Sequence, residues 1–124
     1  MTDKTHSPPP LNEAVETQIR SLINDNDVVL FMKGSAMMPM CGFSSLAVDI
    51  LESLKVTFKD VDVLQSADLR QGIKIFSDWP TIPQLYVKGE FVGGSDILRS
   101  MHQQDELRPF FKEKGVACED AAPS

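Results

Sequence analysis

The composition of this 124-residue chain fits one compact domain with short tails. Hydrophobic residues make up 42% and charged residues 24%, a balance that can bury a core and that excludes an intrinsically disordered chain. The net charge is −6 and no basic cluster is present, which argues against nucleic acid as a partner. Residues 1–10 show neither an apolar signal region nor a membrane span, so we expect no membrane association and a cytoplasmic location.

Cysteine and histidine are scarce in this sequence. It contains two cysteines, Cys41 and Cys118, and two histidines, His6 and His102. Two cysteines cannot form the disulfide framework of a small secreted protein, so a reducing compartment is expected. The four residues lack the close spacing of a zinc site, and we assign no function to Cys118, His6 or His102.

Proline content and apolar periodicity predict the domain boundaries. Residues 1–10 contain three consecutive prolines and no apolar periodicity, and residues 115–124 are small and polar. Both segments are predicted to be flexible tails. The domain is predicted to span residues 11–114.

The first half of the domain alternates helices and strands. Apolar residues recur at helical spacing in residues 11–23, and Val28–Met32 is a continuous apolar run typical of a buried central strand. A loop over residues 35–40 precedes residues 43–54, whose apolar positions again follow a helical period. Cys41 is therefore predicted to lie at the N-terminus of this helix.

The residue pattern in the second half of the domain predicts a hairpin that lies between helices in the sequence. Residues 57–63 alternate as a strand, and Ser66 is a predicted N-cap of the next helix. Two short apolar runs then flank Lys88-Gly89, a connection typical of a tight antiparallel hairpin. The two runs are Gln84–Val87 and Glu90–Val92. Two last helices are expected, one from Ser95 and one over residues 107–114. This order predicts an α/β fold in which a small mixed sheet lies between helices.

Its position makes Cys41 the strongest candidate for chemistry. At a helix N-terminus the unpaired backbone N–H groups and the helix dipole favour thiolate, which is both the nucleophile and the metal ligand. Lys33, at the end of the preceding strand, is a second source of positive potential. The alternative is that Cys41 is a buried, inert side chain. Gly42 argues against that alternative, because a glycine there leaves room for a ligand or another chain.

Three further groups of residues are candidates for ligand binding. Trp79–Gln84 contains two prolines before a strand, where a cis bond would turn backbone groups outward to pair with an extended peptide. A proline-stiffened loop is the alternative there. Arg70 and Lys74 share one helix face and either clamp a carboxylate or form a solvated charged face. Ser95 and Asp96 begin a helix, where capping and binding of carboxylate or ammonium groups are both open to them.

Methionines are concentrated just before Cys41. Met37, Met38 and Met40 either form an adaptable apolar contact surface or pack the loop in which they lie. Of these two interpretations, packing is the one that we expect.

Four motifs occur in order and at compatible spacing within residues 12–114. The motifs are Phe31-Met32-Lys33-Gly34, Cys41-Gly42-Phe43-Ser44, Trp79-Pro80-Thr81-Ile82-Pro83-Gln84-Leu85 and Gly93-Gly94-Ser95-Asp96-Ile97. In this combination the chain resembles the CGFS monothiol glutaredoxins. The resemblance implies a thioredoxin-like (glutaredoxin) fold with a four-stranded mixed sheet flanked by helices. It also implies that Pro83 is in cis and that glutathione lies between Cys41 and the Thr81-Ile82-Pro83 segment.

The resemblance further implies how glutathione would be held. Lys33 and Arg70 would hold its glycine carboxylate, and Ile82 would pair with its cysteinyl backbone. Ser95 and Asp96 would take the γ-glutamyl end, with helix N–H groups facing the carboxylate and Asp96 facing the ammonium.

An iron–sulfur role is consistent with a single cysteine at this position. By the resemblance, Cys41 would be the catalytic residue and the protein's iron ligand. A 2Fe-2S cluster takes four thiolates, so two Cys41 thiolates and two glutathiones would bridge a homodimer that separates into monomers without the cluster. The resemblance implies a carrier for iron–sulfur cluster assembly and transfer, with apo iron–sulfur client proteins and a BolA-type protein as partners.

Two other functions are open from the sequence. One is a glutathione-dependent thiol-disulfide oxidoreductase that removes glutathione from mixed disulfides through Cys41. Against it, Ser44 stands where dithiol relatives carry a resolving cysteine. The other is an iron-status adaptor for a BolA-type partner. Many relatives also carry a cysteine where this chain has Ser95, so an internal disulfide with Cys41 is not expected by that route.

Overall fold

The central strand of the sheet forms from the five consecutive apolar residues of β1 (Val28–Met32), all of which are buried in the computed structural model. The structure describes residues 11–119. β1 pairs in parallel with β2 (Lys59–Asp62) and antiparallel with β3 (Gln84–Val87), and β3 pairs antiparallel with β4 (Glu90–Gly93). The strand order is β2-β1-β3-β4, which confirms the predicted four-stranded mixed sheet.

The strand β2 is shorter than the predicted strand over residues 57–63. Its last residue, Asp62, accepts a hydrogen bond from the backbone N–H of Leu64 through Oδ1, at 2.9 Å. This side-chain contact begins the short 3-10 helix η2 (Val63–Gln65). The strand therefore ends one residue earlier than alternation of apolar residues indicates.

Within residues 11–119, five α-helices cover the sheet. Their bounds are α1 (Glu13–Asp25), α2 (Gly42–Ser53), α3 (Ala67–Ser77), α4 (Ser95–Gln103) and α5 (Leu107–Glu113). Asn12 caps α1, because its Oδ1 accepts from the N–H of Ala14 at 2.8 Å. Ser66 caps α3 as predicted, with Oγ accepting from the N–H of Leu69 at 3.1 Å. In this part of the chain no helix is both long enough and apolar enough to span a bilayer.

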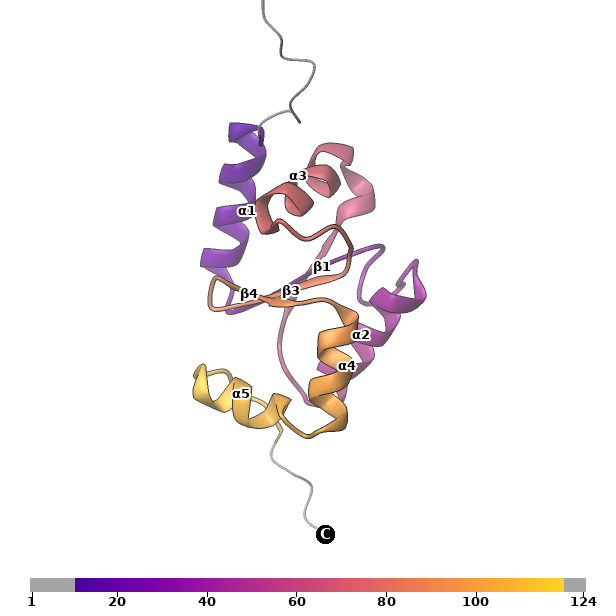
Figure 1. The fold of residues 1–124 in the computed structure, drawn as a ribbon, viewed down its shortest axis with the longest axis vertical. Helices are drawn as coiled ribbons and strands as arrows, with labels where there is room; N and C mark the ends of the chain where they lie inside the picture. Colours follow the sequence, from indigo (N-terminus) through magenta and orange to yellow (C-terminus); the bar gives the residue numbers. More distant parts are fainter. Residues whose placement is uncertain (1–10, 120–124) are drawn as a thin grey trace, which may run out of the picture.

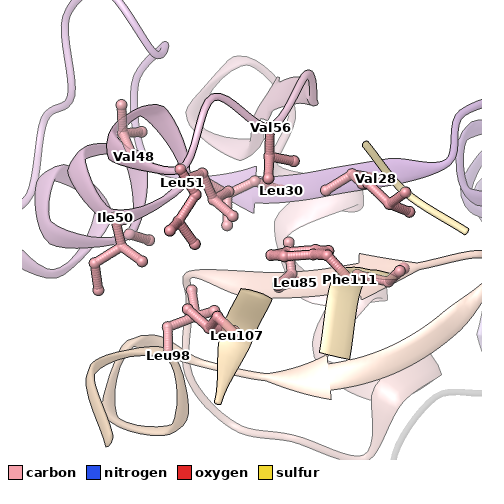
Figure 2. Packing of buried hydrophobic residues seen from close by; sticks show 14 of the residues in the cluster. Val28, Leu30, Val48, Ile50, Leu51, Val56, Leu85, Leu98, Leu107 and Phe111 are labelled. Atoms are coloured by element: carbon pink, nitrogen blue, oxygen red, sulfur yellow. The ribbon is translucent and has the colours of Figure 1, made fainter. Parts of the chain in front are cut away.

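The helices form two layers, one on each face of the sheet (Figure 1). α1 and α3 cover one face, where Ile19 and Ile73 pack with the sheet in the smaller apolar cluster. α2, α4 and α5 cover the other face, where Leu51, Leu98 and Phe111 belong to the larger cluster (Figure 2). All five side chains are fully buried, so the sheet separates two hydrophobic cores.

The segment after α5 packs on the domain. Val116 is 7% exposed and belongs to the larger apolar cluster, and the backbone N–H of Glu119 donates to the carbonyl of Leu54 at 2.6 Å. The packing therefore continues to Glu119, beyond the boundary expected at residue 114. The reason is that the apolar side chain of Val116 is buried in the larger cluster. The predicted tail at residues 1–10 and the last residues, 120–124, lie outside the described part of the chain.

Candidate functional site

The segments that carry the candidate residues begin or end at one edge of the sheet. The parallel strands β1 and β2 lead into α2 and α3, so both helices begin at the C-terminal edge of these strands. β3 starts at this edge, because Gln84 pairs with Phe31 near the end of β1. β4 ends there, because Gly93 pairs with Leu85, and α4 follows. The predicted site residues that this topology places at the edge are Lys33, Cys41, Arg70, Ile82, Ser95 and Asp96.

Cys41 is the N-cap of α2, as predicted, and it is half-buried. The backbone N–H of Ser44 is the main cause that lowers the pKa of Cys41 below its ordinary value. Partial burial opposes this effect, and the N–H of Phe43, the charge of Lys33 and the Ser44 hydroxyl reinforce it. A side chain at Gly42 would meet no atom within 4 Å. Cys41 is thus an accessible thiol with thiolate character, which does not fit the alternative of an inert, buried cysteine.

Lys33 and Ser44 connect the end of β1 to the first turn of α2. The backbone N–H of Lys33 donates to Ser44 Oγ at 3.1 Å, and Ser44 is fully buried. At the far end of the loop, the N–H of Met40 donates to the carbonyl of Lys33 at 2.9 Å. These contacts hold Lys33 close enough to Cys41 for its charge to act on the thiol.

Two aspartates of β2, neither of which was predicted from the sequence, bind the same loop. Asp62 Oδ1 accepts from the backbone N–H of Gly34 at 2.9 Å, and Asp60 Oδ2 accepts from the N–H of Ala36 at 2.7 Å. Burial opposes the ionisation of Asp62, but the N–H groups that it accepts, foremost that of Leu64, hold its pKa below the ordinary value. The sequence contained one signal for this pair, the Asp-Val-Asp pattern at the end of a predicted strand. Alternate side chains of a strand share one face, so the two aspartates were expected to lie on the same side.

A buried glutamine holds the segment before β3. Gln84 is fully buried, and its Nε2 donates to the carbonyls of Trp79 at 3.1 Å and Thr81 at 3.0 Å. The peptide bond between Ile82 and Pro83 is cis, as expected, and the side chain of Ile82 is buried. Gln84 therefore supports the loop whose backbone is predicted to pair with glutathione, a role that was not predicted from the sequence.

Ser95 and Asp96 lie at a hollow beside this segment. The hollow has a volume of about 260 Å³ and is lined by Trp79, Thr81, Gly94, Ser95, Asp96 and Ile97. Asp96 is largely exposed and forms an ion pair with Arg99, with Oδ1 at 3.3 Å from Nη2. The first turn of α4 and one carboxylate therefore meet at a space into which a small polar group can fit.

The other candidates are less closely connected to the thiol. Arg70 lies in the first turn of α3, half-buried like Lys74, and topology alone places it at the edge. Cys118 follows α5, and His102 is exposed near the C-terminus of α4, so both lie away from Cys41. Within residues 11–119, no three His, Cys, Asp or Glu side chains gather in a way that could hold a metal ion.

Comparison with known proteins identifies the family. The Glutaredoxin family model matches residues 28–92. An uncharacterized monothiol glutaredoxin of Synechocystis is 51% identical over 98 residues, which cover 79% of this chain and 92% of the relative. The chain belongs to the monothiol glutaredoxins.

Solved structures agree with this glutaredoxin in fold. A monomeric truncated mutant of Trypanosoma brucei 1-C-Grx1 is 40% identical and superimposes with a TM-score of 0.79, covering 86% of this chain and 96% of that one. A buckwheat glutaredoxin–glutathione complex, only 21% identical, has a TM-score of 0.73 and covers 84% of this chain and 93% of that one, a likeness of fold alone. The predicted thioredoxin-like fold is confirmed.

The methionines of this glutaredoxin's loop are far more exposed than expected. Met37 is 97% exposed, Met38 68% and Met40 63%, and Phe43 of α2 is 60% exposed. The expectation that the methionines pack the loop is wrong. Ser35 and Met38 close a tight turn, in which each N–H donates to the other's carbonyl at 3.1 Å, so the tip of the loop stands in solvent. We call Met37, Met38, Met40 and Phe43 the apolar rim of Cys41.

Proposed function

We propose that this glutaredoxin binds glutathione beside Cys41 and carries a 2Fe-2S cluster between two subunits, in iron–sulfur cluster assembly and transfer. The observation that carries the proposal is the accessible Cys41 thiol at a helix N-terminus, with its pKa lowered, next to a serine rather than a second cysteine. A 2Fe-2S cargo takes four thiolates, and Cys41 would supply one of them. A second chain and two glutathiones would supply the remaining three.

The groups at the sheet edge suit the parts of glutathione. Lys33 and Arg70 are the cations proposed for its glycine carboxylate. The backbone of Ile82 is proposed to pair with its cysteinyl unit, and Ser95 and Asp96 with its γ-glutamyl end at the hollow of about 260 Å³. A buckwheat glutaredoxin that shares the fold was solved as a complex with glutathione, which supports glutathione as the ligand.

The apolar rim supports contact with a second protein at the cluster. These four exposed apolar side chains lie within four residues of Cys41 in the sequence. Exposed apolar groups are typical of a binding surface, and methionine adapts to more than one partner. We propose that the partners are a second subunit, apo iron–sulfur clients and a BolA-type protein. Binding of a BolA-type protein, measured with and without cluster, tests the adaptor function, since a sensor requires the two affinities to differ.

Anaerobic reconstitution with iron, sulfide and glutathione tests the carrier function. Wild type is expected to form a coloured dimer only when glutathione is present, as measured by visible absorption and size-exclusion mass. Cys41→Ser is expected to stay a colourless monomer, whereas Cys118→Ser, the matched control for the second cysteine, is expected to behave as wild type. A colourless wild-type monomer, or full colour in Cys41→Ser, would contradict the proposal.

A second candidate function is supported by the same thiol. Because Cys41 favours thiolate and space is open around Gly42, it can attack the glutathione sulfur of a mixed disulfide and release the client as a thiol. A second glutathione thiolate would then attack the Cys41–glutathione disulfide, releasing oxidised glutathione and the Cys41 thiolate. Steady-state turnover of a glutathionylated substrate tests this function, and a rate equal to that of Cys41→Ser would exclude it.

A further inference from the structure

Trp79, in the loop before β3, is held in place through both its backbone and its ring. Its N–H donates to the carbonyl of Lys74 in the last turn of α3 at 3.1 Å, and its carbonyl accepts from Nε2 of the buried Gln84, also at 3.1 Å. The indole packs against the ring of Phe91 with the ring centres 5.6 Å apart, and Phe91 contacts the buried ring of Tyr86 at 5.5 Å. The fold therefore fixes the indole before any ligand binds.

The indole lies beside the hollow at the start of α4. Trp79 is 37% exposed and lines this hollow of about 260 Å³ together with the first residues of the helix. A Cβ built on Gly94, the N-cap of α4, would lie 3.5 Å from the indole Nε1. Within residues 11–119 the indole N–H donates to no protein group. A free N–H donor is thus available next to the N-terminus of α4.

We propose that Trp79 determines the specificity of this site for a γ-glutamyl unit. The inference rests on the proposed function, in which the γ-glutamyl end of glutathione binds at the hollow. The indole N–H would donate to the α-carboxylate of that unit, beside the N–H groups of α4, while Asp96 faces its ammonium group. The apolar ring would pack on its two methylene groups. Cysteinylglycine, which lacks the γ-glutamyl unit, would make none of these contacts.

Gly94 keeps the hollow open beside the indole. A Cβ there would lie 3.1 Å from the carbonyl oxygen of Pro83, in addition to its contact with the indole nitrogen. The backbone of Gly94 is extended, which any residue can adopt, so Gly94→Ala adds a methyl group at the hollow without conformational strain of its own. This variant changes the hollow while the indole stays in the chain.

The experiment measures which thiol compound Cys41 retains as a mixed disulfide, in a Cys118→Ser background. The Cys41 thiolate attacks one sulfur of a symmetric disulfide, a new S–S bond forms, and the other half leaves as a thiolate. Buffers of glutathione, γ-glutamylcysteine or cysteinylglycine, each with its own disulfide, are compared at equilibrium by intact mass. Every constant involves the same protein thiol, so the ratio of two constants for one variant cancels any change in Cys41 itself.

Wild type is expected to favour glutathione over cysteinylglycine. Trp79→Phe keeps a ring but loses the N–H, and should lower this preference about three- to tenfold. Trp79→Ala loses the ring as well and should lower it further, and Gly94→Ala should also lower it. Phe58→Ala is the control, because it removes a half-buried aromatic ring at the opposite edge of the sheet, and it should leave the preference unchanged.

A second ratio separates recognition from general support of the loop. Glutathione and γ-glutamylcysteine differ only in the glycine, so the Trp79 variants should leave the preference between these two unchanged. A similar fall in both ratios would mean that Trp79 only supports the loop, and would overturn the proposal, as would a wild-type preference for glutathione over cysteinylglycine in both Trp79 variants. If neither variant folds, as judged by circular dichroism, a Gly94→Ala ratio equal to that of Phe58→Ala decides against the proposal.

Failure of this inference can be told from failure of the proposed function. A wild type with no preference for glutathione over cysteinylglycine would overturn both, because the γ-glutamyl unit would then not be recognised at all. A selective wild type whose Trp79 variants are equally selective would overturn the role of Trp79 alone and leave glutathione binding intact.

Discussion

The thiolate character of Cys41 comes from residues on both sides of it in the sequence. The N–H groups of Ser44 and Phe43 follow it, and the charge of Lys33 reaches it from the end of β1. We predict that Lys33→Gln raises the pKa of Cys41 and slows its alkylation near neutral pH about two- to fivefold, because a nearby positive charge is lost. Lys55→Gln, at the opposite edge of the sheet, is the matched control. Equal rates in the two variants would contradict the role of Lys33.

Tyr86 is the second residue whose ionisation the fold changes. It is 2% exposed and packs against the rings of Phe31 and Phe91, and burial raises its pKa to about 12 from the ordinary 10.0, with the Ser77 hydroxyl opposing the rise. Its contribution to stability is therefore complete below pH 10.0 and is lost as the pH rises toward 12.

The chain has one tyrosine, so phenolate absorbance reports on Tyr86 alone. We predict that phenolate absorbance appears near pH 12 in the folded protein and that wild type loses stability between pH 10.0 and 12. Tyr86→Phe should lose less stability over this interval, measured by urea unfolding at several pH values. Ionisation at pH 10.0 in the folded state would show that the ring is not buried.

At the scale of elements, the turn between β1 and α2 depends on a residue without a side chain. Gly34 has a φ of +88°, and a Cβ there would lie 2.5 Å from the carbonyl oxygen of Met38 and 2.6 Å from the N atom of Met40. We predict that Gly34→Ala lowers the free energy of unfolding by about 2–4 kcal/mol, because conformational strain and a backbone clash add.

Gly115 provides the control for this prediction. It also has a positive φ, +76°, but a Cβ there would have no atom within 4 Å, so Gly115→Ala should lower the free energy of unfolding by only about 1 kcal/mol. Urea unfolding measures both variants. Similar losses would mean that the loop moves to accept the methyl group and that Gly34 is required for its φ alone.

At the scale of the whole molecule, the larger core is completed by residues that follow the last helix. Val116 is buried in the cluster with Leu54, whose carbonyl also accepts the N–H of Glu119. A chain that ends at Lys114 is predicted to lose about 2 kcal/mol of unfolding free energy relative to a chain that ends at Glu119, because it leaves the place of Val116 unfilled. Equal stability of the two chains, measured by urea unfolding, would restore the boundary at residue 114.

The sequence by itself determined the order of the α-helices and strands and the place of the reactive thiol. A continuous apolar run predicted β1, and apolar periodicity predicted α2. A helix that begins after Cys41 makes that cysteine an N-cap wherever the helix packs. The Lys88-Gly89 turn likewise determined the hairpin of β3 and β4. These features are local: each depends on residues a few positions apart, whose spacing and conformational preference can be read directly.

Only the tertiary structure decided which distant groups surround the thiol. Asp62 and Asp60 lie 28 and 24 residues after the N–H groups that they accept, and the parallel pairing of β1 with β2 brings them together. The same holds for Val116, whose burial depends on a space left between other elements, and for Met37, whose exposure depends on how the loop turns. Burial and hydrogen bonding between distant segments follow from packing, which residue spacing along the chain does not specify.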